Sequence, residues 1–189
     1  MDKNPETFAK EVEDSVSKNP GQPPLDQWHP ELSGDMDMVI RRNGQWIFKG
    51  EPLTREAIVR LFSTILRRED DGEFYLVTPV EKWRIKVEDA PLLAHTLTVR
   101  GSGEDQIVSV TTNVGETLDI GEEHPLDVSE YPGTGEPRPV VLVRHGVEAR
   151  LLTSAFYDLA AHLTERTVEG ETVYGVVSGG KFWKVGQGG

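Results

Sequence analysis

Residues 175–183 read GVVSGGKFW and have the spacing of a phosphate-binding loop. Gly175 is followed by four residues and then by Gly180 and Lys181, which matches the Walker A pattern up to its final Ser or Thr. In such a loop the backbone amides and the lysine hold phosphate oxygens, and the Ser or Thr binds Mg²⁺. The spacing therefore raises the hypothesis of a nucleotide hydrolase or kinase.

The residues that follow argue against a phosphate-binding loop. A Walker A loop leads from a strand into a helix whose N-terminus faces the phosphates. Here Phe182 stands where the Ser or Thr would be, and the run Phe182-Trp183-Lys184-Val185 is β-prone. Ser178-Gly179-Gly180 is therefore predicted to be the turn of a β-hairpin.

Other catalytic signatures are missing from the sequence. It has no H-E-x-x-H motif, no G-x-S-x-G elbow and no EF-hand loop. The 189 residues include no Cys, which excludes thiol catalysis, disulfides and Cys-ligated metals. The acidic turn Glu122-Glu123-His124 is more typical of a solvated turn than of a metal site. The sequence predicts no catalytic residue, no metal site and no cofactor.

Local basic residues in an acidic chain are the remaining candidates for chemistry. The formal net charge is -12, so a cluster of Arg or Lys would stand out as an anion site. For each single Arg, neutralisation of neighbouring acidic residues is the alternative, and Asn113 is equally explained as a turn residue. The candidate ligand-binding residues are Arg41, Arg55, Thr78, Glu81, Lys82, Thr112, Asn113, Arg144, Arg150 and Lys181.

The charge balance also limits the partners. With 32 acidic and 20 basic residues, the chain repels nucleic acid and anionic membranes, so neither is expected as a partner. The first fifteen residues are acidic and lack the apolar run of a signal peptide. No stretch has the length that spans a bilayer. We therefore expect a cytoplasmic bacterial protein, by elimination.

The first half of the chain predicts an arm and then a sheet with one helix. Residues 1–35 are polar and rich in Pro, and we expect an arm with a short N-terminal helix, docked by Leu25 and Trp28. Asn43-Gly44 predicts a type I′ hairpin. Thr54 is the expected N-cap of the next helix. The apolar stripe of that helix consists of Ile58, Leu61, Phe62, Ile65 and Leu66. Two strands are predicted after it, at 73–78 and 82–87.

The second half is β-rich and then repeats the order of the first. Four short strands are predicted between Leu97 and Val128, followed by a Pro/Gly loop at 130–139. From 139 the order strand, turn, strand, helix, turn, strand, turn, strand returns. Matching residues of the two stretches, such as Thr54 and Thr153, lie 98 to 102 positions apart in the sequence. This spacing favours an internal duplication over chance similarity between two ββαββ units.

The predicted fold is α+β, with two domains of antiparallel sheet that are each packed on one helix. The N-terminal arm covers 1–35, the first domain 36–90 and the larger second domain 91–189. Because a one-sided sheet must cover its apolar face, two such units are expected to pack together and leave a cleft. We expect the candidate residues to converge on that cleft.

Several stretches resemble the uncharacterised, largely proteobacterial family known as domain of unknown function 1285. They are LVTPVEKWRIKVEDAPLL (76–93), NGQWIFKGEPLTREAIVRLFSTILRREDDGEFYLV (43–77), the TTN of 111–113 and VRHGVEARLLTSAFYDL (143–159). The resemblance runs from Trp28 to Gly186. It implies a duplicated α+β core, a second domain loosely similar to a pleckstrin-homology fold, a nucleotide-like ligand at the domain interface and a role in signalling. It carries over no catalytic residue.

The function favoured at this point is a non-enzymatic binding module for a small anionic ligand, such as a nucleotide. One alternative is a protein–protein interaction scaffold without a small ligand. The other is a hydrolase that acts on an anionic substrate, which would require an acid or base with a perturbed pKa.

Overall fold

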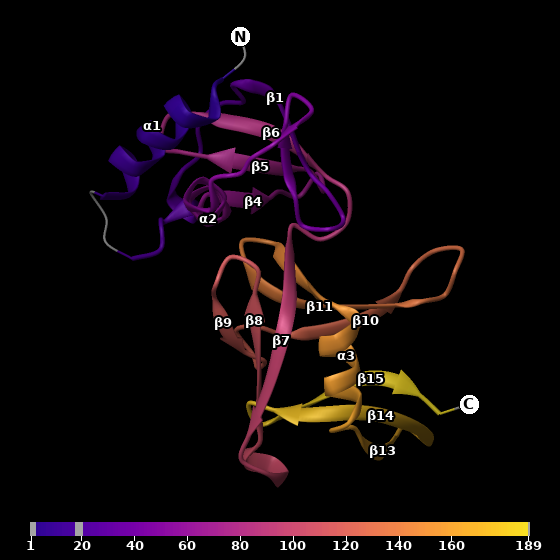
Figure 1. The fold of residues 1–189 in the computed structure, drawn as a ribbon. Coiled ribbons are helices and arrows are strands. Elements are labelled where there is room, and N and C mark those ends of the chain that lie inside the picture. The colour runs from indigo at the N-terminus through magenta and orange to yellow at the C-terminus, as the bar shows by residue number, and fades with distance from the viewer. Residues whose placement is uncertain (1–2, 18–20, 189) are drawn as a thin grey trace. The chain divides into compact units, whose positions relative to one another are not determined.

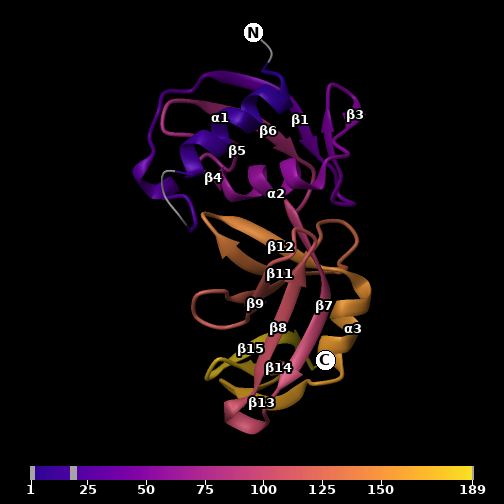
Figure 2. The ribbon, with the colours of Figure 1, turned by 60° about the vertical axis from the view of Figure 1, so that its left-hand side comes forward.

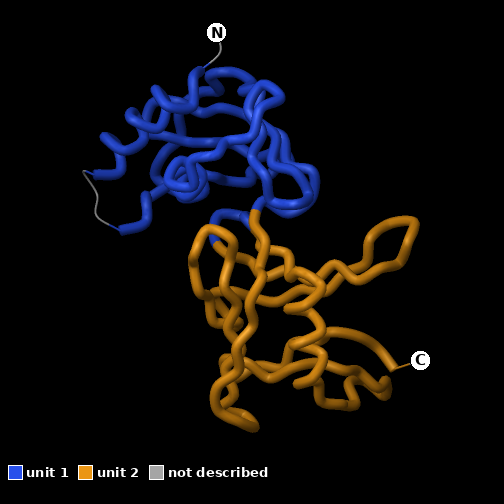
Figure 3. The backbone as a smooth tube through the Cα atoms, in the orientation of Figure 1, with its two compact units in different colours: residues 1–91, 144–147 blue, residues 92–143, 148–189 orange. Residues whose placement is uncertain are grey.

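A computed structural model describes residues 3–17 and 21–188 of the chain. The chain divides into two compact units, shown in blue and orange in Figure 3. Unit 1 comprises Met1–Pro91 and Arg144–Val147, and unit 2 comprises Leu92–Val143 and Glu148–Gly189. Within the described residues, no helix is both long enough and apolar enough to cross a membrane.

Unit 1 is a six-stranded sheet with two helices. In chain order its elements are α1 (Pro5–Ser17), the 3-10 turn η1 (Leu25–Gln27), β1 (Gly34–Ile40), β2 (Trp46–Phe48), β3 (Glu51–Pro52), α2 (Glu56–Thr64), β4 (Leu66–Arg68), β5 (Phe74–Val77) and β6 (Lys82–Val87). The strand order is β3-β2-β1-β6-β5-β4. All neighbours are antiparallel except β1 and β6. The prediction of a purely antiparallel sheet is wrong for this pair, because the long connection through α2, β4 and β5 lets β6 return parallel to β1.

The core of unit 1 lies between its helices and its sheet. Phe62 of α2 is fully buried and contacts two rings: Phe8 of α1 at a centroid distance of 5.5 Å and Trp46 of β2 at 6.3 Å. Figures 1 and 2 both show α1 beside α2. The predicted N-terminal helix and the docking of the arm are confirmed, since Leu25 and Trp28 are 0% and 8% exposed.

Unit 2 is built from two sheets and one helix. Its elements are β7 (Leu92–Arg100), η2 (Gly103–Asp105), β8 (Ile107–Thr112), β9 (Thr117–Asp119), β10 (Leu126–Glu130), β11 (Pro137–Arg144), β12 (Val147–Leu151), α3 (Thr153–Ala160), β13 (Thr164–Val168), β14 (Glu171–Ser178) and β15 (Lys181–Gln187). The six-stranded sheet has the order β10-β11-β12-β7-β8-β9, and β13-β14-β15 form a second sheet. Here too one pair, β12 with β7, is parallel, against the prediction. The helix α3 lies along β7 (Figure 1).

The same order of elements occurs twice. Two strands, a helix and three strands make up the stretch from β1 to β6, apart from the two-residue β3, and the stretch from β11 to β15. This order fits the predicted duplication. The strand pairing differs, however: β1 joins the β4–β6 meander in one sheet, whereas β11 and β12 pair with strands outside the repeat.

The helix of the first repeat ends earlier than predicted. The helix α2 stops at Thr64, so that Ile65 and Leu66 leave the predicted stripe and Leu66 pairs with Leu76 in the sheet. The hydroxyls of Ser63 and Thr64 donate to the carbonyls of Arg60 and Leu61 at 2.6 Å each. Such bonds from side chain to backbone compete with helix continuation, and β-branched residues favour a strand.

The predicted helix caps and the first hairpin also need correction. Arg55 precedes α2 and Leu152 precedes α3, neither with a capping side chain, so Thr54 and Thr153 are each one residue away from the cap. Asn43 is not among the residues with positive φ, although Gly44 is at 89°. Gly44 N donates to Arg41 O at 2.9 Å and Arg41 N donates to Gln45 O at 2.8 Å. The hairpin therefore closes with a three-residue loop that ends in Gly, and not with a type I′ turn.

The Walker-like stretch is a β-hairpin, as predicted. Ser178 of β14 pairs with Lys181 of β15, and Gly179 and Gly180 between them have φ of 62° and 79°. Ser178 is fully buried, and its Oγ accepts from Val108 N at 2.8 Å and donates to Ile120 O at 2.7 Å. The hydroxyl therefore joins the turn to β8 and to the end of β9.

Candidate functional site

One face of the unit 1 sheet carries a row of polar side chains across four strands. Residues directly opposite one another share a face, and the register places Arg67 opposite Tyr75, Tyr75 opposite Arg84, and Arg84 opposite Asp35. Lys82 lies on the same face because it is two residues from Arg84. We call this surface the charged face, with Asp35, Arg67, Tyr75, Lys82 and Arg84 as its members.

The adjacent row shows why this face is free for polar groups. Leu66, Leu76, Trp83 and Gly34 occupy the next register positions and point to the other face. The three side chains among them are buried. A Cβ on Gly34 would lie 3.3 Å from the Trp83 ring, so the glycine makes room for the indole. Alternation along each strand thus separates the core from the charged face.

Glu69 is held between two cations at the edge of this face. Its Oε2 accepts from Nε and Nη2 of Arg67 at 3.1 and 2.6 Å, and its Oε1 accepts from Nζ of Lys82 at 3.0 Å. The three side chains are only 12%, 24% and 18% exposed for Arg67, Glu69 and Lys82. We call this group the Glu69 clamp.

The clamp fixes the charge of Glu69. Burial raises the pKa of this carboxyl, but the hydrogen bonds from Lys82 and Arg67 outweigh burial and hold the pKa below its usual value. Arg67 is itself fixed, because its Nη1 donates to the carbonyls of Leu25 and Trp28 at 2.7 and 2.9 Å. The clamp therefore also secures the N-terminal arm to β4.

Tyr75 lies next to the clamp and keeps its proton. Its hydroxyl donates to Asp71 at 2.5 Å, and the ammonium of Lys82 lies 4.7 Å from its ring centroid. The hydrogen bond to Asp71, together with burial, raises the pKa of Tyr75, and the same bond lowers the pKa of Asp71. The tyrosine is thus a fixed hydrogen-bond donor at neutral pH and not a base.

A pocket of about 520 Å³ borders the clamp within unit 1. Its walls carry both signs of charge and two imidazoles; they consist of Asp26, His29, Arg67, Arg68, Glu69, Asp70, Asp71 and His145. Burial and the neighbouring Arg144 lower the pKa of His145. Arg68 is held to this wall by its backbone, since its N donates to His145 O at 2.9 Å. The pocket can therefore offer donors and acceptors to one ligand.

Three of the sequence-predicted residues lie beside the clamp. Thr78 is buried, and its Oγ1 accepts from the backbone N of Val80 and Glu81 at 3.3 and 3.0 Å. The hydroxyl thereby shapes the β5–β6 turn that presents Glu81 and Lys82. Glu81 accepts from Lys3 Nζ at 3.1 Å. Of these three, Lys82 alone enters the clamp.

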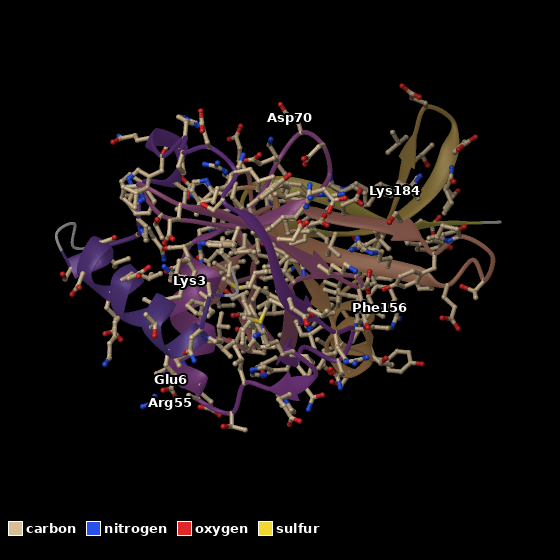
Figure 4. The ribbon with its side chains drawn as sticks, turned by 90° about the horizontal axis from the view of Figure 1, so that it is seen from above. Lys3, Glu6, Arg55, Asp70, Phe156 and Lys184 are labelled. Atoms are coloured by element: carbon tan, nitrogen blue, oxygen red, sulfur yellow. The ribbon has the colours of Figure 1, made fainter. Side chains whose placement is uncertain are left out.

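The other predicted residues of unit 1 lie elsewhere. Arg41 follows β1 at the opposite end of β6 and pairs with Glu88 at 3.5 Å. Arg55 precedes α2 and pairs with Glu6 of α1 at 3.4 Å, and Figure 4 shows these two side chains next to each other. Arg144 donates from Nη2 to Ser63 O at 3.4 Å. These three therefore do not meet at one point.

The predicted residues of unit 2 form one small group and one outlier. Asn113 binds both backbone groups of Leu93. Its side-chain Oδ1 accepts from Leu93 N at 3.1 Å, and its backbone N donates to Leu93 O at 2.8 Å. Arg150 is opposite Leu93 in the parallel β12–β7 pair, and Thr112 is buried beside Asn113. Lys181 lies in the other sheet, 3.8 Å from Glu122.

The sequence did not single out Glu69, Arg67 or Tyr75 as site residues. The predicted helical stripe runs to Leu66, so Arg67 and Glu69 fall near the expected end of a helix, where charged residues are common. The run Leu66-Arg67-Arg68 does not alternate, because Arg68 shares a face with Leu66, so the sequence carries no clear strand signal for the face that holds Arg67.

Metal and acid–base chemistry find little support in the described residues. No group of three or more His, Asp or Glu there could hold a metal ion. His124, considered above for a metal, bonds through Nδ1 to Leu142 O at 3.1 Å. Where carboxyl pKa values are displaced, the direction is downward, at Asp35, Glu69, Asp71 and Asp119. None of these is the raised carboxyl that a general acid requires.

The fold and the clamp define a two-unit α+β protein with a repeated order of elements and a charged sheet face. The chain belongs to the DUF1285 family. Residues 23–90 match the DUF1285 N-terminal domain, described as a domain of unknown function, and residues 91–185 match the DUF1285 C-terminal domain.

Two solved structures are similar to this chain. A DUF1285 family protein from Silicibacter pomeroyi DSS-3 is 40% identical, with 97% of this chain and 95% of that chain covered at a TM-score of 0.86. A DUF1285 family protein from Shewanella baltica OS155 is 27% identical, with 66% and 91% covered at a TM-score of 0.52. No curated protein of established function matches the chain.

Proposed function

We propose that this protein is a non-enzymatic binding module for a small anionic ligand, and that the Glu69 clamp receives the anionic group. The observation that supports the proposal is that both carboxylate oxygens of Glu69 are bound by cations, Arg67 on one side and Lys82 on the other. A planar guanidinium edge plus an ammonium is the donor set that binds carboxylates and phosphates. The Glu69 carboxylate thus occupies the position that a ligand's anionic group would take.

The neighbouring pocket supports a ligand larger than a bare ion. Its volume of about 520 Å³ falls within the usual range of about 300–1,000 Å³ for small-molecule sites. Arg68 and His29 add donors, while Asp26, Asp70 and Asp71 can accept from hydroxyl or amino groups. A molecule with one anionic group and several hydroxyls, such as a nucleotide or a sugar phosphate, matches both the cations of the clamp and the donors and acceptors of the pocket. Binding in a cleft between the repeats, a cytoplasmic location, a role in signalling and a pleckstrin-like second domain stay predictions.

A thermal-shift screen of nucleotides, sugar phosphates and nucleotide second messengers tests the proposal. A ligand at about one hundred times its Kd stabilises the fold by about 2.7 kcal/mol, which raises the Tm by several degrees. Lys82→Gln should abolish the shift, and the matched control Lys10→Gln, at an exposed position of α1, should retain it.

Glu69→Gln should strengthen ligand binding, whereas Lys82→Gln should abolish it. The amide keeps the shape of Glu69 but removes the charge that competes with the ligand. The anion should then bind about tenfold more tightly, equivalent to about 1.4 kcal/mol. If no compound raises the Tm of either the wild type or Glu69→Gln, the clamp is a structural ion pair and the proposal is wrong.

Protein binding is a second candidate function, favoured by a separate observation in unit 2. Tyr157 of α3 is 70% exposed, and Val168 and Tyr174 of the three-stranded sheet are 47% and 37% exposed. Aromatic side chains such as Tyr157 and Tyr174 are enriched at protein–protein interfaces. Tyr157→Ser should weaken a purified partner's affinity without changing the Tm; an unchanged affinity would exclude this surface.

A further inference from the structure

The charged face of unit 1 contains a second hollow, where β1 and β6 separate. The parallel register runs from Asp35 opposite Arg84 to Val39 opposite Lys86. Three residues of β1 therefore face the single residue Ile85 of β6. Extra residues in one strand interrupt the ladder and bend that strand away from its partner. A cavity of about 530 Å³ lies at this point.

The walls of the hollow combine buried strand residues with exposed charges. Met36, Met38 and Ile85 are at most 5% exposed. The charged residues around them are Asp35, Asp37, Glu73, Arg84 and Lys86. Two of these neutralise each other, because Arg84 Nε donates to Asp35 at 2.5 Å.

The other three charges make no direct hydrogen bond or ion pair within the described part of the chain, although the charge of Lys86 acts on Asp35 and helps to lower the pKa of that carboxyl. Neither the carboxylates of Asp37 and Glu73 nor the ammonium of Lys86 makes a hydrogen bond or ion pair with residues 3–17 or 21–188. Lys86 is flanked by Val39 on β1, and Asp37 lies two residues before Val39, within the separated stretch. Two carboxylates and an ammonium thus border the same cavity without a direct contact to one another.

From this arrangement we infer a binding site for a zwitterion of the α-amino-acid class, distinct from the Glu69 clamp. The ligand's ammonium is bound by Asp37 and Glu73, and its carboxylate by Lys86. A simple anion would meet two carboxylates for one lysine, and a simple amine would leave Lys86 without a direct ion pair. A zwitterion satisfies both signs, and since it has no net charge the field of a chain with net charge -12 does not repel it.

The test uses the full chain, isotope-labelled, with free α-amino acids as probes. Each is compared with its N-acetyl form, which lacks the ammonium, and its amide, which lacks the carboxylate. At least one free amino acid should shift the amide resonances of residues 36–39 and 85–86. Both modified forms should bind at least about tenfold more weakly, the loss expected for a hydrogen bond to a charged group. If no amino acid at roughly 10 mM shifts these resonances, against a weak Kd of about 1 mM, the inference is wrong.

Variants separate the two halves of the site. Asp37→Asn and Lys86→Gln should each lower the affinity at least about tenfold, whereas Lys184→Gln in unit 2 should not change it. Asp37 and Lys86 are exposed, and an unchanged amide spectrum away from the hollow would confirm that the fold is kept. If amides and free amino acids bind equally and Lys86→Gln has no effect, the site does not recognise a zwitterion and the inference is overturned.

Discussion

Ser178 shows how a residue in a phosphate-loop pattern can have a purely structural role. Its hydroxyl is fully buried and bonds to the backbone of β8 and to Ile120. Its carbonyl accepts from Trp183 Nε1 at 2.9 Å. A side chain with these bonds is not available to a phosphate. The sequence context already argues against the loop, because the β-prone run from Phe182 to Val185 follows it where a helix would be required.

Glu69 should make the stability of the protein depend on pH. Its pKa is lower in the folded state than its usual value of 4.5, so the unfolded chain binds the proton more readily. The stabilisation by the clamp is therefore complete above pH 4.5 and lost as the pH falls through the folded-state pKa. The difference in free energy of unfolding between the wild type and Glu69→Gln should be largest near neutral pH and shrink towards pH 3.

Urea denaturation of both proteins at several pH values measures this difference. Contributions from the other carboxyls cancel, since the two chains share them. A difference that is constant with pH would show that the folded and unfolded pKa values of Glu69 are equal. The cations of the clamp would then not hold its charge.

At the residue scale the sequence identified part of the site. Lys82 is one of the predicted binding residues and belongs to the clamp. Glu69 and Arg67 were missed because their partners come from other strands and from the arm. Register across strands is a nonlocal property, and a single sequence shows which residues alternate but not which strand lies next to which.

The elements were predicted well in type and less well in extent. The strands β5 and β6 and the hairpins of unit 2 follow from alternation and Gly turns. The first of the two repeat helices was extended too far because Ile65 and Leu66 continue a helical spacing. In α2, the adjacent Ser63 and Thr64 instead bind carbonyls of the last turn, and Leu66 gains a buried position in the sheet.

Gly175 is the residue of the β14–β15 hairpin that most needs to be glycine. An added Cβ would lie 2.2 Å from Trp183 O and 2.6 Å from the Phe182 ring. Gly175→Ala should therefore lower the free energy of unfolding by about 1–3 kcal/mol or more, because either the hairpin or the ring must move. Urea denaturation provides the measurement.

Gly186 on the neighbouring strand is the matched control. No atom lies within 4 Å of its added Cβ, so Gly186→Ala should be neutral or slightly stabilising. If the two variants had equal stability, the close packing of Phe182 on Gly175 would not contribute to the fold.

At the scale of the whole molecule, the sequence predicted the repeated order of elements but not which strands pair in each sheet. Thr54 and Thr153 mark the same place in each repeat, just before or at the start of a helix. Yet β6 pairs with β1 inside the first repeat, whereas β12 pairs with β7, a strand that lies before the second repeat. Local patterns determine the elements, while the competition among strands for partners determines the sheets, and that competition involves residues far apart in the chain.

The net charge leads to a prediction for the molecule as a whole. A charge of -12 at pH 7 destabilises the compact state by self-repulsion. The Debye length falls from about 30 Å at 0.01 M salt to about 10 Å at 0.1 M, so added salt screens this long-range repulsion more than the close ion pairs of the clamp. Raising NaCl from about 10 to about 100 mM should therefore raise the Tm by a few degrees, a change on the order of 1 kcal/mol.

Two controls separate screening from specific ion binding. KCl at equal ionic strength should give the same rise, because screening depends only on ionic strength. At pH 4.9, the isoelectric point, the net charge is near zero and the rise should disappear. A Tm that falls with salt at pH 7 would mean that close pairs such as Arg84–Asp35 outweigh the repulsion. The ion pairs of the charged face, and not the net charge, would then dominate the electrostatic stability of the protein.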